Sequence, residues 1–268
     1  MFVRFFSTLI VTALIAGRWY AHVHSATGSW SGQGDDVALR NVSLSHKLAA
    51  SSHVNWNSGI LSVLISHVWF GGWSFLRVPI AIYVLAFAVI ALAAIGVAVR
   101  LQRSRELPDQ RRDILALMAF YACFWAGLAY HVLITYLSLG VSSSTGWYLF
   151  ATVVAEVVLL VWGLEAFLPV RIVLPLLAIG AAALDLYGTH ALLMPYYTGL
   201  TAHTGGSVPP AFWPPLAHLP LVFSRVGEIR PTWLGTRVLL GWWIGYWIAT
   251  VGAVLVVAAY SRKPPSEA

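Results

Sequence analysis

The segment Pro79–Val99 reads PIAIYVLAFAVIALAAIGVAV, contains no charged residue, and is bounded by Arg77 and Arg100. A helix needs about 20 mostly apolar residues, at ~1.5 Å each, to cross the hydrocarbon core of a bilayer. This segment therefore predicts a membrane-spanning helix. The same reasoning predicts five further spans, of which the first is short: Phe2–Gly17, Ile114–Leu137, Tyr148–Leu168, Ile172–Met194 and Val238–Ala259.

The composition of the whole chain agrees with this prediction. Of the 268 residues, 59% are hydrophobic and 10% are charged, and the mean hydropathy is +0.77. Soluble domains carry about 25% charged residues. The composition therefore excludes a soluble globular domain, a disordered chain and a coiled coil. We predict an all-α fold, a polytopic transmembrane helix bundle that forms a single membrane domain over residues 1–268.

The distribution of arginine predicts the orientation of this bundle. Residues 100–113 form a short connection that is rich in arginine, and short loops rich in Lys and Arg face the cytoplasm. Alternation of six spans then places both termini in the cytoplasm and the long loops 21–77 and 195–237 outside.

The net charge of +6 raises the question of a nucleic-acid partner. The basic residues flank apolar segments, however, and no base-reading or phosphate-cradling motif is present, so we expect membrane lipid as the partner and no nucleic acid. Cys123 is the single cysteine, which excludes an intrachain disulfide. No spacing typical of a metal site is present, so no resident metal is predicted.

Each long loop has its own pattern. In the first, Ser58–Trp69 places Ser58, Ser62 and Ser66 four residues apart, on one stripe of a helix too short to span. We expect a re-entrant or interfacial helix there. The second loop is rich in proline and is expected to be irregular.

Ionisable residues inside predicted spans are the first candidates for function. Each costs about 2.5–3.5 kcal/mol at mid-helix, so such residues face the bundle or a cavity. His131, Glu156 and Asp185 lie at similar depths on three successive spans and predict one polar cluster. Structural hydrogen bonds between helices are the alternative. Glu165 lies on the opposite helix face and is expected to reach the interface or to pair with Arg171.

The outward carboxylates are the second candidates. Asp35 and Asp36 follow Gly34 in the first loop, and adjacent carboxylates in such a loop suit a general base or ligands of a divalent cation. A solvated turn is the alternative. No other cofactor is predicted.

Aromatic residues are the third candidates. Most of the 13 tryptophans lie on the outward loops or outer helix ends. An interfacial aromatic belt explains part of this enrichment. The asymmetry also suits an outward groove in which aromatic faces stack on sugar rings or line an isoprenoid tail. Its candidate residues are Trp69, Trp73, Trp147, Tyr148, Trp242 and Trp243.

Four short motifs carry a resemblance to a known family: AGRWY at Ala16–Tyr20, TGSWSG at Thr27–Gly32, SHVWFGGWS at Ser66–Ser74 and TGWYLFA at Thr145–Ala151. Together they resemble passages of bacterial multi-pass C-class (family-39-like) membrane glycosyltransferases and of a related uncharacterised membrane family. The resemblance implies transfer of a sugar from a polyprenyl-phosphate donor at the outer face of the bacterial cytoplasmic (inner) membrane, which is the expected location of this chain.

The match corresponds to the C-terminal half of the family pattern. The resemblance therefore implies a truncated protein or one whose partner is a separate N-terminal-half protein. The family's catalytic acid lies in that other half, so Asp35 and Asp36 are not equated with it. Trp147 stands where the family has arginine.

Three functions follow from these observations. The first is a glycosyltransferase-like protein that uses a lipid-linked sugar. The second is a subunit with the same fold that binds lipid-linked glycan or acts as a scaffold without catalysis. The third is a proton-coupled transporter in which Glu156, Asp185 and His131 relay protons, although the inverted repeats of transporters are not evident.

Overall fold

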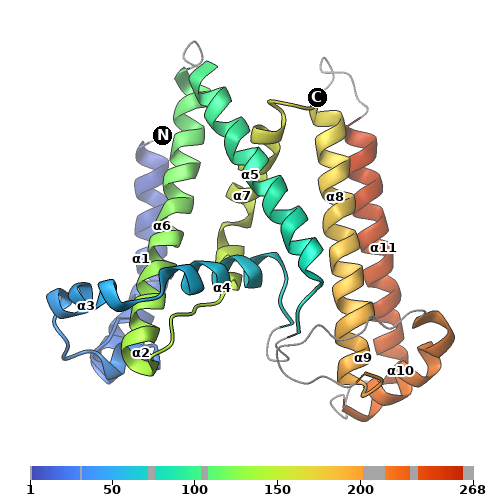
Figure 1. Cartoon of the computed structure of the whole chain (residues 1–268), viewed down its shortest axis with the longest axis horizontal. Helices are drawn as coiled ribbons and strands as arrows, with labels where there is room; N and C mark the ends of the chain where they lie inside the picture. The colour runs from blue at the N-terminus through green and yellow to red at the C-terminus, as the bar shows by residue number, and fades with distance from the viewer. Residues whose placement is uncertain are drawn as a thin grey trace. The chain divides into compact units, whose positions relative to one another are not determined.

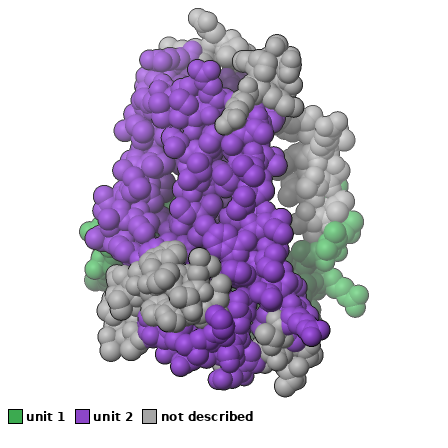
Figure 2. All heavy atoms as spheres, turned by 90° about the vertical axis from the view of Figure 1, so that its right-hand side faces the viewer, with its two compact units in different colours: residues 1–64, 123–148 green, residues 65–122, 149–268 purple. Residues whose placement is uncertain are grey.

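The computed structural model in Figure 1 describes residues 2–30, 32–71, 76–103, 108–201, 215–229 and 235–261. All regular structure in these ranges is helical, which confirms the predicted all-α class. The chain divides into two compact units, which Figure 2 colours separately. Unit 1 contains Met1–Leu64 and Cys123–Tyr148, and unit 2 contains Ile65–Ala122 and Leu149–Ala268.

Four helices of the described residues are long and apolar enough to cross a membrane, which supports the predicted membrane protein. Three of them are α5 (Ile80–Arg103), α6 (Pro108–Leu139) and α11 (Thr236–Tyr260). The fourth runs over Val170–Tyr197 and comprises α8 (Val170–Leu186), a π-helical segment (Tyr187–Leu193) and α9 (Met194–Tyr197).

Two other predicted spans differ from expectation. The segment Tyr148–Leu168 begins in a 3-10 segment, Gly146–Thr152, and continues as α7 (Val153–Leu164). The 12 residues of α7 extend ~18 Å, which is shorter than the ~30 Å hydrocarbon core. α1 (Phe2–Thr27) continues past the predicted end at Gly17, because neither glycine nor proline occurs between Gly17 and Gly28. Gly28 has φ +73°, and its N–H donates to the His24 carbonyl at 2.8 Å, as at a glycine-capped helix end.

Unit 1 contains α1, α2 (Gly34–Ala38), α3 (Leu44–Ala50) and parts of α4 (Trp56–Val68) and α6. α4 confirms the helix predicted at Ser58–Trp69. It approaches α6 closely at Gly59, where a Cβ atom would lie 2.8 Å from Val132 Cγ1. The Ser62 hydroxyl accepts from the Ser144 N–H at 3.1 Å, which ties α4 to the segment after α6.

Unit 2 contains a close crossing of α5 and α7. A Cβ atom at Gly96 would overlap the carbonyl oxygen of Gly163, and a Cβ atom at Gly163 would overlap that of Ala93. Small residues let membrane helices approach in this way. At the same interface Arg100 Nη1 lies 2.6 Å from Glu165 Oε2. The predicted pairing of Glu165 with Arg171 is therefore wrong, because Arg100 on the neighbouring helix reaches the carboxylate.

The rest of unit 2 places α8 and α11 side by side, as Figure 1 shows. The predicted irregular loop 195–237 contains a helix, α10 (Pro215–Ile229). Proline has no backbone N–H, and in the first turn of a helix the N–H groups have no acceptor within the helix. Pro215 can therefore begin α10 rather than preventing it. Arg225 Nη1 donates to the Thr198 carbonyl at 2.7 Å and fixes α10 to the end of α9.

Candidate functional site

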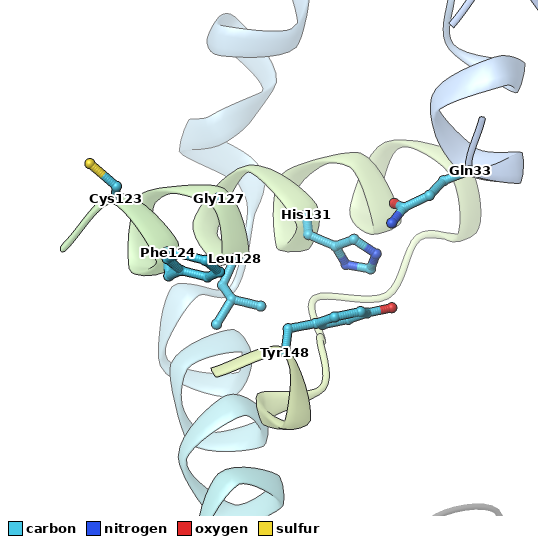
Figure 3. Close-up of a pocket in the computed structure, with 7 residues that line it drawn as sticks. All are labelled: Gln33, Cys123, Phe124, Gly127, Leu128, His131 and Tyr148. Carbon is cyan, nitrogen blue, oxygen red and sulfur yellow. The ribbon is translucent and has the colours of Figure 1, made fainter. Parts of the chain in front are cut away.

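A hollow of about 370 Å³ lies in unit 1 on one face of α6, as Figure 3 shows. Helical spacing on α6 presents Phe124, Gly127, Leu128 and His131 to the hollow, because residues three and four apart share a face. Cys123 lies at one end of the hollow, and its thiol is free. The other lining residues are Gln33, directly before α2, and Tyr148, in the 3-10 segment.

The polar part of the hollow centres on His131. Its Nδ1 lies 3.2 Å from the Ser144 hydroxyl and 3.4 Å from the Thr135 hydroxyl. These contacts occupy Nδ1 and leave Nε2 for a ligand. The ring centroids of His131 and Tyr148 are 5.7 Å apart, and Figure 3 shows the His131 ring directed towards Tyr148 and Gln33. A hydroxylated ligand would meet three hydrogen-bonding side chains here.

An apolar pocket of about 160 Å³ lies on the adjacent face of α6, also in unit 1. Leu128 lines both this pocket and the hollow. The described residues that line this pocket come from α4 and α6, and none of them is charged. Its residues are Trp56, Gly59, Ile60, Val63, Trp125, Leu128, Ala129 and Val132.

Asp35 and Asp36 lie in the first turn of α2 and have different surroundings. Asp36 accepts from the Ser29 hydroxyl at 2.8 Å and from the Tyr130 hydroxyl at 3.3 Å, and the buried Lys47 ammonium lies 3.8 Å away. No side-chain hydrogen bond or ion pair of Asp35 is formed within the part of the chain that the structure describes. Asp36 is therefore a fixed structural anion, whereas the Asp35 carboxylate is available to a ligand.

A divalent cation at these carboxylates stays a prediction. Across the described ranges, no three His, Cys, Asp or Glu side chains are grouped so that they could hold a metal ion.

Unit 2 brings Glu156 together with His67. Both carboxylate oxygens of Glu156, in the first turn of α7, lie 2.8 Å from Nε2 of His67, near the end of α4. The side chains are 14% and 9% exposed, respectively. The ring of Phe150 lies beside His67, with centroids 5.5 Å apart. Glu156 thus belongs to a buried pair.

A second polar group of unit 2 links α8 with α11. The Tyr246 hydroxyl donates to the Asp185 carboxylate, and the Trp243 indole N–H donates to Nε2 of His190 at 2.9 Å. The three predicted cluster residues therefore have separate partners. His131 contacts Ser144 and Thr135, Glu156 contacts His67, and Asp185 contacts Tyr246. A single cluster of the three stays a prediction.

The aromatic residues predicted to form a groove have several different environments. Tyr148 lines the hollow of unit 1. Trp69 packs its indole against Gly188 in unit 2, where a Cβ atom would overlap the ring. Trp243 contacts His190, and Trp242 is 63% exposed. Trp73 and the side chain of Trp147 lie outside the described residues.

Sequence reasoning did not find three residues of these sites: Gln33, Lys47 and His67. His67 offered the clearest signal, because it is an ionisable side chain within the short apolar helix that the serine spacing predicted. Its partner Glu156 is 89 residues away, and no local pattern relates the two.

Comparisons with protein-family models, with characterised proteins and with solved structures found no match to this chain.

Proposed function

We propose that this chain is an integral membrane protein that binds a lipid-linked sugar in the hollow of unit 1. The proposal rests on the lining of the hollow, in which apolar residues of α6 are combined with three hydrogen-bonding side chains, Gln33, His131 and Tyr148. The volume of about 370 Å³ falls within the ~300–1,000 Å³ of small-molecule sites. Such sites are mostly apolar and use a few polar groups to orient the ligand.

The chemistry of the walls suits both parts of such a ligand. The amide of Gln33, the imidazole of His131 and the phenol of Tyr148 donate and accept hydrogen bonds, as sugar hydroxyls require. The Tyr148 ring also offers an aromatic face. The adjoining pocket with Trp56 and Trp125 contains only apolar walls and suits an isoprenoid chain.

The sequence resemblance supports the same ligand class. The motifs at Ala16–Tyr20 and Thr145–Ala151 resemble those of transferases that use polyprenyl-phosphate sugars, and Tyr148 of the second motif lines the hollow. We accordingly propose a location in the bacterial cytoplasmic membrane and a partner protein equivalent to the N-terminal half of those transferases.

Filling the hollow is expected to remove this binding. A Cβ atom at Gly127 meets no atom within 4 Å, so the first atom of a side chain introduced by Gly127→Leu is accommodated next to the hollow. Leucine also favours a helix over glycine by ~1 kcal/mol, so loss of binding would not reflect unfolding. We expect the affinity for a polyprenyl-phosphate hexose to fall at least about tenfold, which is ~1.4 kcal/mol. Equilibrium binding to the purified full chain in detergent micelles measures this change.

Gly17→Leu is the matched control for this experiment. It makes the same substitution in α1, also at a Cβ position with open space, but away from the hollow. Binding should be unchanged. Equal affinity for a phospholipid or for polyprenyl phosphate without sugar would contradict recognition of the sugar, and full binding by Gly127→Leu would contradict the location.

Catalysis of sugar transfer is a second candidate function, favoured by Asp35. Its carboxylate lies two residues after Gln33 and is not held by a side-chain partner within the described part of the chain. A positioned base contributes about 10²–10⁴-fold to rate. Asp35→Asn is therefore expected to reduce transfer by that factor in membranes supplied with the donor, while binding persists. The exposed Asp109→Asn is the control, and an undiminished rate in Asp35→Asn would leave binding as the only role.

A further inference from the structure

Among the described residues of unit 2, the side chains of His67 and His190 are both largely buried but differ in hydrogen bonding. Nε2 of His190 accepts from the Trp243 indole N–H at 2.9 Å, and Nδ1 lies 3.2 Å from the Leu186 carbonyl. An indole N–H only donates and a carbonyl only accepts. His190 must therefore carry its proton on Nδ1 and keep Nε2 unprotonated. Both ring nitrogens are satisfied, which fixes one neutral tautomer.

His67 is satisfied at one nitrogen only. Nε2 lies 2.8 Å from each oxygen of Glu156, whereas Nδ1 is buried and has no hydrogen-bond partner among the residues that the structure describes. The His67 side chain is only 9% exposed, so ordinary contact with bulk water does not explain the free nitrogen. A buried polar atom without a partner is uncommon in folded proteins and is a candidate for a functional role.

We propose that His67 and Glu156 form a proton-binding pair in which Nδ1 of His67 takes up and releases one proton. In the unloaded state a neutral imidazole donates its Nε2–H to the Glu156 carboxylate, and the pair has a net charge of −1. In the loaded state Nδ1 also carries a proton, and the imidazolium and carboxylate together are neutral. The proton comes from a hydronium ion, whose O–H bond breaks and leaves water as the N–H bond forms on Nδ1.

The environment of the pair favours such an exchange. A net charge buried in an apolar surrounding is costly, so uptake of the proton removes that charge from the interior. The ring of Phe150 lies beside His67, with ring centroids 5.5 Å apart, and both side chains of the pair are largely buried. Because Nδ1 is buried, exchange follows local opening of the unit, as for other buried groups.

Glu156 is the charged group in direct contact with His67. The other ionisable groups on the surrounding elements of unit 2 have contacts elsewhere or are exposed. The Tyr83 hydroxyl donates a hydrogen bond to the Trp69 carbonyl, and Arg100 forms an ion pair with Glu165. Asp185 accepts a hydrogen bond from Tyr246, and His190 accepts one from Trp243. Arg77 and Arg171 are exposed. Tyr187 packs in the cluster around Val78 and Leu192. The proton is therefore assigned to the His67–Glu156 pair.

Solid-state NMR of the full chain in bilayers tests the proposal. The protein is labelled with ¹⁵N-histidine and ¹³C-carboxyl glutamate, and the His67 signal is assigned by dipolar coupling between Nε2 and the Glu156 carboxyl. Spectra are recorded between about pH 5 and pH 8, where histidine side chains ordinarily change charge. We expect the Nδ1 resonance of His67 to move reversibly upfield as the nitrogen is protonated. The His190 resonances should stay constant, because both nitrogens are occupied.

Two variants sharpen the experiment. In Glu156→Gln the imidazolium has no counter-charge, so the transition of His67 should disappear from this range. Glu165→Gln removes a carboxylate at the end of the same helix, where it pairs with Arg100, and should leave the transition unchanged. An unchanged His190 signal shows that each variant is folded.

A constant Nδ1 resonance of His67 in the unaltered protein would overturn the proposal and leave a static structural pair. The same transition in a folded Glu156→Gln variant would also overturn it, because the carboxylate would then have no part in proton binding. The measurement on the unaltered protein decides the proposal even if Glu156→Gln does not fold.

Discussion

Gly163→Leu is expected to separate α5 from α7 and to lower the free energy of unfolding by about 3 kcal/mol or more. A side chain at this position meets the backbone of Ala93, and backbone atoms at a helix crossing have no alternative rotamer. The added atoms must therefore push the two helices apart. This would also pull Arg100 away from Glu165 and the Trp162 carbonyl, both of which it reaches across the same interface.

Gly180→Leu provides the matched comparison. It places the same side chain on α8, where a Cβ atom meets nothing within 4 Å. Reversible unfolding in mixed micelles of dodecyl maltoside and SDS measures both variants. An equal loss of stability would show that glycine matters at position 163 for a reason other than close packing.

His67→Leu is expected to destabilise unit 2 by about 3–5 kcal/mol, because loss of its hydrogen-bonding partner leaves the Glu156 carboxylate buried alone. Glu156 is 14% exposed, and His67 Nε2 contacts both of its oxygens. The double variant His67→Leu/Glu156→Leu should recover most of that loss, because apolar residues of similar size often replace a buried pair without net cost.

The same unfolding assay gives the coupling between the two sites through a double-mutant cycle. Additive losses in the two single variants, with no recovery in the double variant, would contradict a direct interaction. This outcome is independent of proton binding, because a static pair would show the same coupling.

The positions of the long helices were predictable because the apolar content of a span is a local property. The predicted span Pro79–Val99 corresponds closely to α5 at Ile80–Arg103. The agreement is expected, because the length of a span and its flanking charges can be identified from consecutive residues. The short α7 was not predictable in the same way. Tyr148–Leu168 is also predominantly apolar, although it contains Glu156 and Glu165, and apolarity does not distinguish a 3-10 segment followed by a short helix from one continuous helix.

The candidate site shows the same limit. His131 was identified because an ionisable residue in an apolar segment is unusual, and Tyr148 because of its aromatic neighbours. Gln33 was missed because an amide in a loop carries no distinctive pattern. Glu156 was identified, but His67 was not recognised as its partner, because their pairing depends on tertiary structure and spans 89 residues.

The packing of Trp69 on Gly188 makes the two positions dependent on each other. The π-helical segment Tyr187–Leu193 presents a glycine where the indole lies, and any larger residue at position 188 would occupy the volume of the ring. A change at either position alone is unfavourable: a smaller residue at 69 leaves a void, and a larger one at 188 collides. Relatives of this chain should therefore vary at the two positions together, and a correlated pair at this spacing offers a means of recognising distant homologues.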